Sequence, residues 1–221
     1  MTAAPAYTPP LGIEWLTPLY DRVIALMTRE GRWRASLIEQ IAPRPGLNIL
    51  DLGCGTGSLA KALWEACPDL RIIGIDPDTH AVSIAREKTR TAGSAIVILE
   101  GFPGSVHLPR GWRPDAVVIS LVLHQVPLAG KRDLLAYARS VLPPGGVMHV
   151  ADYSEQRGVM RAAFRLTVQV LDGVEDTQPN ADGALPMLIR EAGFELAELD
   201  RLITPTGSLS LFSATPGSQQ R

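Results

Sequence analysis

The sequence predicts an α/β fold, a Rossmann-like doubly wound parallel sheet with helices on both faces. Short, continuously apolar segments alternate with helical segments along most of the 221 residues, which is typical of such a sheet. A glycine-rich stretch follows the first of these apolar segments. The last two apolar segments are joined by a turn too short for a parallel crossover, so the final strand should run antiparallel.

Seven segments are predicted to be strands. The first five are rich in Ile, Val and Leu, and they lie at 47–52, 71–76, 95–100, 115–120 and 146–152. The last two, 194–202 and 208–214, alternate apolar and polar residues like half-buried strands.

Helical patterns separate the strands. They cover residues 12–42, where Pro43 and Pro45 end the pattern, and then 58–66, 79–91, 131–142, 156–171 and 185–192. The polar segment 172–183 is predicted to be a loop, long enough to act as a lid over a site. We expect a disordered N-terminus at 1–11, a helical cover at 12–42, one domain at 43–214 and a flexible C-terminus at 215–221.

Composition and charge exclude several classes of protein. The net charge is −2 and basic residues form no tail, so nothing in the charge distribution favours a nucleic-acid partner. The start lacks the features of a signal peptide, and no run of 18 apolar residues exists to insert stably into a membrane. Cys54 and Cys67 cannot form a disulfide framework or a zinc site. We therefore expect a cytoplasmic protein without a bound metal, either monomeric or homodimeric.

The glycine-rich stretch is the first candidate for a binding site. Gly53, Gly55 and Gly57 follow the first strand, and ligands of open α/β sheets bind at the carboxyl ends of the strands. Gly53 and Gly55 would let the backbone turn tightly and lie against a ligand. Gly57 would let the next helix begin close to the strand.

An acidic residue closes the second strand. Asp76 lies 25 residues after Asp51, where its carboxylate can accept hydrogen bonds from two ribose hydroxyls. The alternative is that Asp76 caps the following helix. The glycine spacing is G-x-G-x-G rather than the G-x-G-x-x-G of dinucleotide sites, and no Walker-type lysine follows. A nucleoside other than NAD is therefore favoured.

Four segments together resemble class I S-adenosylmethionine-dependent methyltransferases. They are ILDLGCGTGSLA, IIGIDPD, DAVVISLVLHQV and SVLPPGGVMHVADYS. The likeness extends to the methyltransferase type 11 branch, which includes the ubiquinone/menaquinone-biosynthesis C-methyltransferases. The resemblance implies S-adenosylmethionine as cofactor, S-adenosylhomocysteine as product, and the sheet order 3-2-1-4-5-7-6 with the seventh strand reversed.

The same resemblance assigns roles to residues of this chain. The three glycines would lie along the methionine part of the cofactor, with Asp51 at its amino group and Asp76 at its ribose. The remaining candidate positions are Cys54, Pro77 against the adenine, and Ser120 and Leu121 under the methionine. One position departs from the family, because Phe102 stands where an aspartate usually reads the adenine amino group. Phe102 would instead pack on the adenine or offer it a backbone N–H; the alternative is that it belongs to the core.

Two residues are candidates for catalysis. His124 follows the fourth strand and would serve as a base for a phenol, enol or amine acceptor. The alternative, which we favour, is that it packs or orients the loop. Tyr153 closes the fifth strand at the expected rim of the pocket, where it would contact the substrate; the alternative is that it only packs. His149, in the middle of that strand, is predicted to be core.

The expected function is methylation of a small acceptor at carbon, oxygen or nitrogen. Trp15, Tyr20, Met27 and Trp33 would make the helical cover apolar, which favours a lipophilic or aromatic acceptor. The alternative is that these residues pack in the core. Two alternatives stay open: a non-catalytic domain that binds the cofactor, and a nicotinamide-dependent oxidoreductase, against which the glycine spacing argues.

Overall fold

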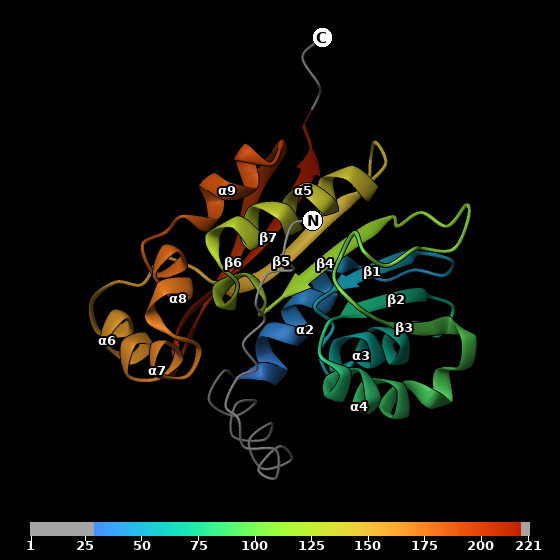
Figure 1. Cartoon of the computed structure of the whole chain (residues 1–221), viewed down its shortest axis with the longest axis horizontal. Helices are drawn as coiled ribbons and strands as arrows, with labels where there is room; N and C mark the ends of the chain where they lie inside the picture. The colour runs from blue at the N-terminus through green and yellow to red at the C-terminus, as the bar shows by residue number, and fades with distance from the viewer. Residues whose placement is uncertain (1–28, 218–221) are drawn as a thin grey trace.

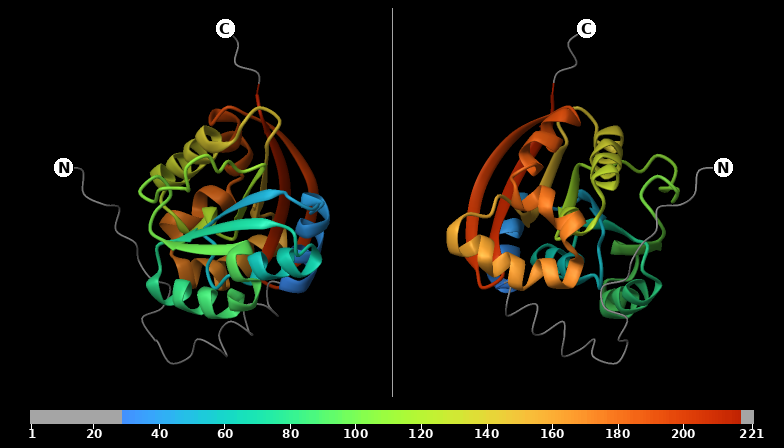
Figure 2. Two further views of the ribbon diagram at one scale, coloured as in Figure 1. Left: turned by 90° about the vertical axis from the view of Figure 1, so that its right-hand side faces the viewer. Right: turned by 60° about the vertical axis from the view of Figure 1, so that its left-hand side comes forward.

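The computed structural model describes residues 29–217, which form a seven-stranded sheet with helices on both faces (Figures 1 and 2). The strand order is β3-β2-β1-β4-β5-β7-β6, so the predicted order is confirmed. Segment 1–11, most of the predicted cover and Trp15, Tyr20 and Met27 lie outside the described residues, as do residues 218–221.

The seven strands begin and end within a few residues of the predicted ranges. They are β1 Asn48–Leu52, β2 Arg71–Asp76, β3 Ile96–Glu100, β4 Ala116–Ser120, β5 Val147–Tyr153, β6 Phe194–Thr204 and β7 Gly207–Pro216. The first five pair in parallel, while β7 runs antiparallel to both β5 and β6. Only two residues join β6 to β7, and such a connection forces an antiparallel pair.

Eight helices and two short 3-10 turns are found within residues 29–217. They are α2 Glu30–Ile41, α3 Ser58–Ala66, α4 Thr79–Thr89, η2 Arg90–Ala95, η3 Leu123–Gln125, α5 Leu128–Val141, α6 Gly158–Leu166, α7 Val168–Asp172, α8 Val174–Ala181 and α9 Leu185–Glu191. Buried side chains of α2, α3 and α4 form one core with the sheet, and those of α5 and α9 form a second core on its opposite face. Side chains of a strand alternate between its two faces, so each strand contributes to both cores.

Trp33 belongs to the first of these cores. It is fully buried together with Leu37 and Ile41 of the same helix. This indole therefore packs against the sheet, and the prediction that it covers an acceptor is wrong.

The segment after β5 differs from its prediction. The expected single helix at 156–171 is broken at Thr167, whose backbone leaves the helical region (φ −121°, ψ −79°). The expected loop at 172–183 is mostly helix α8, bounded by Gly173 and Gly183. Gly173, Gly183 and the internal Pro179 gave this segment the composition of a loop, but the two glycines only bound the helix.

No helix of residues 29–217 is long and apolar enough to cross a membrane.

Candidate functional site

The carboxyl ends of β1, β2 and β4 meet at the point where the strand order reverses, which is where open α/β sheets bind ligands. The loop after β1 carries the three predicted glycines. All three have positive φ angles, 74° at Gly53, 49° at Gly55 and 71° at Gly57. These left-handed conformations are readily adopted by glycine and strained for other residues.

The surroundings of the three glycines differ. A Cβ atom on Gly53 would collide with the side chain of Val122, in the loop after β4. One on Gly57 would lie 3.0 Å from the Cβ of Ala85 on α4, so the close neighbour of Gly57 is α4. Among residues 29–217, nothing lies within 4 Å of a Cβ placed on Gly55. Gly55 is therefore the glycine of the three that borders open space.

A fourth glycine, Gly74 in β2, was not predicted to matter. A Cβ atom there would lie 2.8 Å from the sulfur of Cys54. The thiol of Cys54 thus fits against the bare backbone of β2, and burial raises its pKa. Cys54 therefore turns its side chain into the sheet, and only its backbone remains to face a ligand.

The carboxylate of Asp76 shapes the glycine loop. Its Oδ2 accepts a hydrogen bond from the N–H of Gly55 at 2.8 Å, and its Oδ1 accepts one from the N–H of Asp78 at 2.9 Å. Burial raises its pKa, and the two hydrogen bonds oppose that rise. Helix α4 is capped by Asp78, which accepts from the N–H groups of His80 and Ala81. The alternative role of Asp76 as the helix cap is therefore wrong.

Asp51, near the end of β1, is the most unusual group of the site. Its side chain is 0% exposed, and neither carboxylate oxygen has a hydrogen-bond partner among residues 29–217. Burial raises its pKa to about 7, the charge of Asp76 adds to the rise, and the Arg34 guanidinium on α2 opposes it. Buried polar groups without partners are rare and costly, so this carboxyl fits a ligand that brings a cationic donor.

Phe102 follows β3, and Ser120 and Leu121 stand at the end of β4, so all three lie at the same edge of the parallel sheet. The side chain of Phe102 is 37% exposed, so the alternative that it belongs to the core is wrong. Its backbone N–H already donates to the hydroxyl of Ser105 at 3.1 Å, which leaves the aromatic ring as the group available to a ligand. Pro77 and Ser120 are half-buried, and Leu121 has a positive φ of 55°, which is strained for a residue with a side chain.

His124 is held between two carboxylates. Its Nδ1 lies 2.7 Å from Oδ1 of Asp152 on β5, and its Nε2 lies 3.4 Å from Oδ2 of Asp172 at the end of α7. Burial alone would lower its pKa, but the two aspartates outweigh burial and raise it to about 9. The imidazole is therefore charged at neutral pH. Oδ2 of Asp152 also accepts from the N–H groups of Val122 and Leu123, and so fixes the loop after β4.

Tyr153 and His149 are both buried. The hydroxyl of Tyr153 lies 2.6 Å from that of Thr206, and its ring stands edge-on to His124. The expectation that Tyr153 forms the rim of the pocket is wrong, and burial raises its pKa. His149 contacts Gln40 at 2.9 Å and is buried as predicted; burial lowers its pKa to about 4.

Lys131 is a residue that sequence reasoning missed. Its side chain is fully buried, and its Nζ donates to the carbonyl oxygens of Leu123, Val126 and Asp176. This ammonium joins the loop after β4 to helix α8, and burial lowers its pKa to about 8. Its position in a helical pattern gave no sign of burial, because its partners are backbone carbonyl oxygens, which no side-chain pattern indicates.

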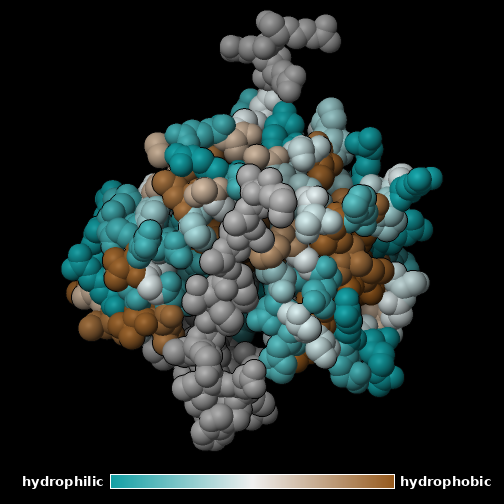
Figure 3. Space-filling view, in the orientation of Figure 1, coloured by the Kyte–Doolittle hydropathy of each residue, from teal (hydrophilic) through white to brown (hydrophobic). Residues whose placement is uncertain are grey.

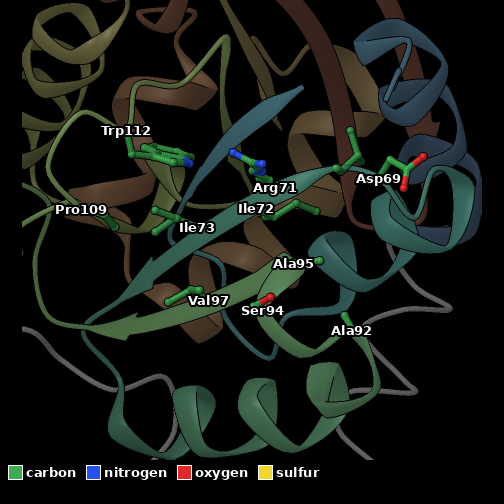
Figure 4. A pocket seen from close by; sticks show the side chains of 11 residues that line it. Asp69, Arg71, Ile72, Ile73, Ala92, Ser94, Ala95, Val97, Pro109 and Trp112 are labelled. Atoms are coloured by element: carbon green, nitrogen blue, oxygen red, sulfur yellow. The ribbon is translucent and has the colours of Figure 1, made fainter. Parts of the chain in front are cut away.

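A cavity of about 480 Å³ lies away from these residues (Figure 4). Its lining includes Arg71 and Val97, near the amino ends of β2 and β3, and Trp112 of the loop that joins β3 to β4. None of the predicted site residues lines it.

Within residues 29–217, no group of three or more His, Cys, Asp and Glu side chains is arranged to hold a metal ion.

Sequence comparisons with known proteins find methyltransferases. A family model described as "Methyltransferase domain" matches residues 49–146. The demethylmenaquinone methyltransferase of Thermus thermophilus is 29% identical over 157 residues, which cover 70% of each protein. The ubiquinone/menaquinone biosynthesis C-methyltransferase of Syntrophotalea carbinolica is 29% identical over 151 residues, 67% of this chain but only 62% of that protein.

The fold also has solved counterparts. Magnesium protoporphyrin IX methyltransferase from Synechocystis, solved with bound S-adenosylhomocysteine, superposes with a TM-score of 0.62 and 18% identity. The match covers 84% of this chain and 83% of that one. At this level of identity the likeness concerns the fold.

We predict that His124 stabilises the fold as a cation. Its pKa is raised from 6.5 to about 9, so this contribution is fully present below about pH 6.5 and is lost as the pH rises through about 9. His124→Gln should lower the free energy of unfolding by about 3 kcal/mol near pH 6 and by much less above about pH 9, in urea titrations.

His149→Gln is the matched control, because burial depresses the pKa of His149. The stability of the wild type relative to this variant should instead fall as the pH drops from about 6.5 to about 4. A destabilisation by His124→Gln that stays constant across the range would contradict a charged His124.

Proposed function

Because this chain belongs to the class I S-adenosylmethionine-dependent methyltransferases, we propose that it methylates a small lipophilic or aromatic acceptor. Its cofactor is S-adenosylmethionine, which supplies a sulfonium-bound methyl group for in-line displacement. We assign cofactor binding to residues 43–214, and the cover to the part of 12–42 that precedes helix α2, because α2 packs on the sheet. Support for the acceptor class comes from the relatives named as demethylmenaquinone and ubiquinone/menaquinone methyltransferases.

The observation that carries the proposal is the unpartnered Asp51. An amino group of the ligand would give this buried carboxyl the donor that it lacks within residues 29–217. Each oxygen of Asp76 already accepts one backbone hydrogen bond and retains a second lone pair, which fits the two ribose hydroxyls. The open space at Gly55 leaves room for a ligand to lie against the backbone.

We propose that the protein aligns the acceptor with the methyl group and excludes water, since the sulfonium of the cofactor already activates that methyl group. We propose that His124 positions the loop after β4 and takes no proton from the acceptor. A charged imidazole has no free lone pair, and both of its nitrogens face carboxylates. Tyr153 is likewise proposed to support this loop, because its hydroxyl is buried against Thr206.

We predict that S-adenosylhomocysteine binds with a Kd in the low- to mid-micromolar range, about −6 to −8 kcal/mol, and that NAD does not compete. Asp51→Asn should weaken binding by about 1.5–3 kcal/mol, because it removes a charged acceptor. Gly55→Val should weaken it at least as much, because its side chain would fill the open space and strain a φ of 49°. Titration calorimetry with S-adenosylhomocysteine on the wild type and on each of the two variants measures these affinities.

Asp69→Asn is the control, because Asp69 is exposed and lines the cavity away from the site. It should bind S-adenosylhomocysteine as the wild type does. Unchanged affinity in Asp51→Asn and Gly55→Val, with both proteins folded by circular dichroism, would overturn the assignment of the site.

We predict a small kinetic effect at His124. With an acceptor taken from a panel of phenols, hydroquinones and amines, His124→Gln should lower kcat by less than about tenfold near neutral pH. A general base would contribute about 10²–10⁴. A loss above a hundredfold, with S-adenosylhomocysteine affinity unchanged, would show that His124 accepts the proton of the substrate.

A further inference from the structure

Helix α6 presents an apolar face to solvent. Val159 and Leu166 are 76% and 77% exposed, and Ala162 between them is also exposed. The spacing i, i+3, i+7 places these three side chains on one side of the helix. Val170 of α7, beyond the break at Thr167, is 70% exposed as well. We call these four residues the α6–α7 apolar face.

This face is not needed to hold α6 on the protein. The opposite side of the helix carries Phe164, which is fully buried with its ring 5.1 Å from that of Tyr153. Figure 3 shows hydrophobic surface gathered at the lower left, where Figure 1 places α6 and α7. Several large aliphatic side chains exposed together mark an interaction surface more often than single ones do.

Cationic residues accompany the apolar face. Residues 157–171 contain three arginines and no acidic residue. Arg157 and Arg161 pair with Glu155 and Asp182, whereas Arg165 makes no ion pair within residues 29–217 and influences Asp182 only through its charge. On a helical projection Arg165 lies next to Ala162, three residues earlier, at one border of the apolar face. An apolar stripe bordered by arginine is the pattern of a helix that lies in a membrane interface.

The face is also connected to the candidate site. Helix α7 ends at Asp172, whose carboxylate faces His124. The carbonyl of Asp176 in α8 accepts from Lys131, which holds the loop after β4. The segment that bears the apolar face is therefore joined to the loop after β4, which is part of the candidate site.

We propose that the α6–α7 apolar face docks on an anionic lipid surface, with the aliphatic side chains among the acyl chains and Arg165 at the headgroups. The reason for docking rests on the proposed function: a lipophilic acceptor partitions into lipid, so an enzyme bound to the lipid surface would meet its acceptor there. A second copy of the chain fits this face less well. A two-fold contact uses the same patch on both copies, so it would bring the arginines of two copies together.

Flotation with lipid vesicles tests the proposal in the absence of any acceptor. The full chain should float with vesicles that contain phosphatidylglycerol, and much less with vesicles of phosphatidylcholine alone. Leu166→Asp should weaken vesicle binding by about tenfold or more, because it places a charge among the acyl chains. Arg165→Gln should weaken it by roughly fivefold, because each arginine near the surface contributes about that factor.

Met187→Asp is the matched control, since Met187 is an exposed aliphatic side chain on α9, outside the face. It should bind vesicles as the wild type does. Leu166→Asp and Arg165→Gln should still bind S-adenosylhomocysteine, which shows that they are folded; if Leu166→Asp does not fold, Val170→Asp takes its place.

Two results would overturn the proposal. One is a wild type that does not bind anionic vesicles; if this protein also forms a dimer that Leu166→Asp dissociates, the face is an interface between two copies. The other is vesicle binding that none of the substitutions in the face weakens. Vesicle binding by an enzyme that methylates only water-soluble acceptors would support the docking face and contradict the proposed acceptor class.

Discussion

Asp51 carries a carboxyl group at the centre of the fold, buried on all sides and without a hydrogen-bond donor among residues 29–217. Its strand, β1, lies between β2 and β4, so the group stands where the two halves of the sheet diverge. The neighbouring Asp76 raises the free energy of the ionised form further, and Arg34 lowers it only in part. A folded chain keeps such a group at the expense of stability, which is common at sites that bind a ligand.

The rest of the described site is built around this buried carboxyl. Gly55 holds the loop in a left-handed turn beside open space, and Asp76 fixes that turn through the N–H of Gly55. Beyond the end of β4, Asp152 holds the loop that follows this strand, and the charged His124 joins Asp152 to Asp172. In the proposed function, Gly55 and Asp76 recognise the nucleoside, while His124 and Asp152 connect the site to α7.

The sequence was sufficient for features that depend on neighbours along the chain. Strand periodicity, the glycine spacing and the short turn after β6 predicted the sheet class and the reversed last strand. Asp51 and Asp76 could be placed because strand ends meet at one edge of a parallel sheet.

Features that depend on residues far along the chain were missed in whole or in part. Gly53 was predicted as a turn residue, but its need to avoid the side chain of Val122 was not, and Gly74, which faces Cys54, was not predicted at all. The polar composition of 172–183 concealed helix α8, which packs beside the buried Lys131. The charge of His124 depends on Asp152 and Asp172, distant residues whose proximity no local pattern indicates.

The central claim is that Asp51 receives the cationic end of the cofactor, and proton release on binding tests it most directly. With a pKa raised to about 7, most of the Asp51 carboxyls are protonated at about pH 6.5, and an ammonium ligand selects the ionised form. Calorimetry of S-adenosylhomocysteine binding in buffers of different ionisation enthalpy should therefore show release of more than about half a proton at that pH. The release should vanish in Asp51→Asn. Equal proton release in the wild type and in Asp51→Asn, or none in either, would contradict the account.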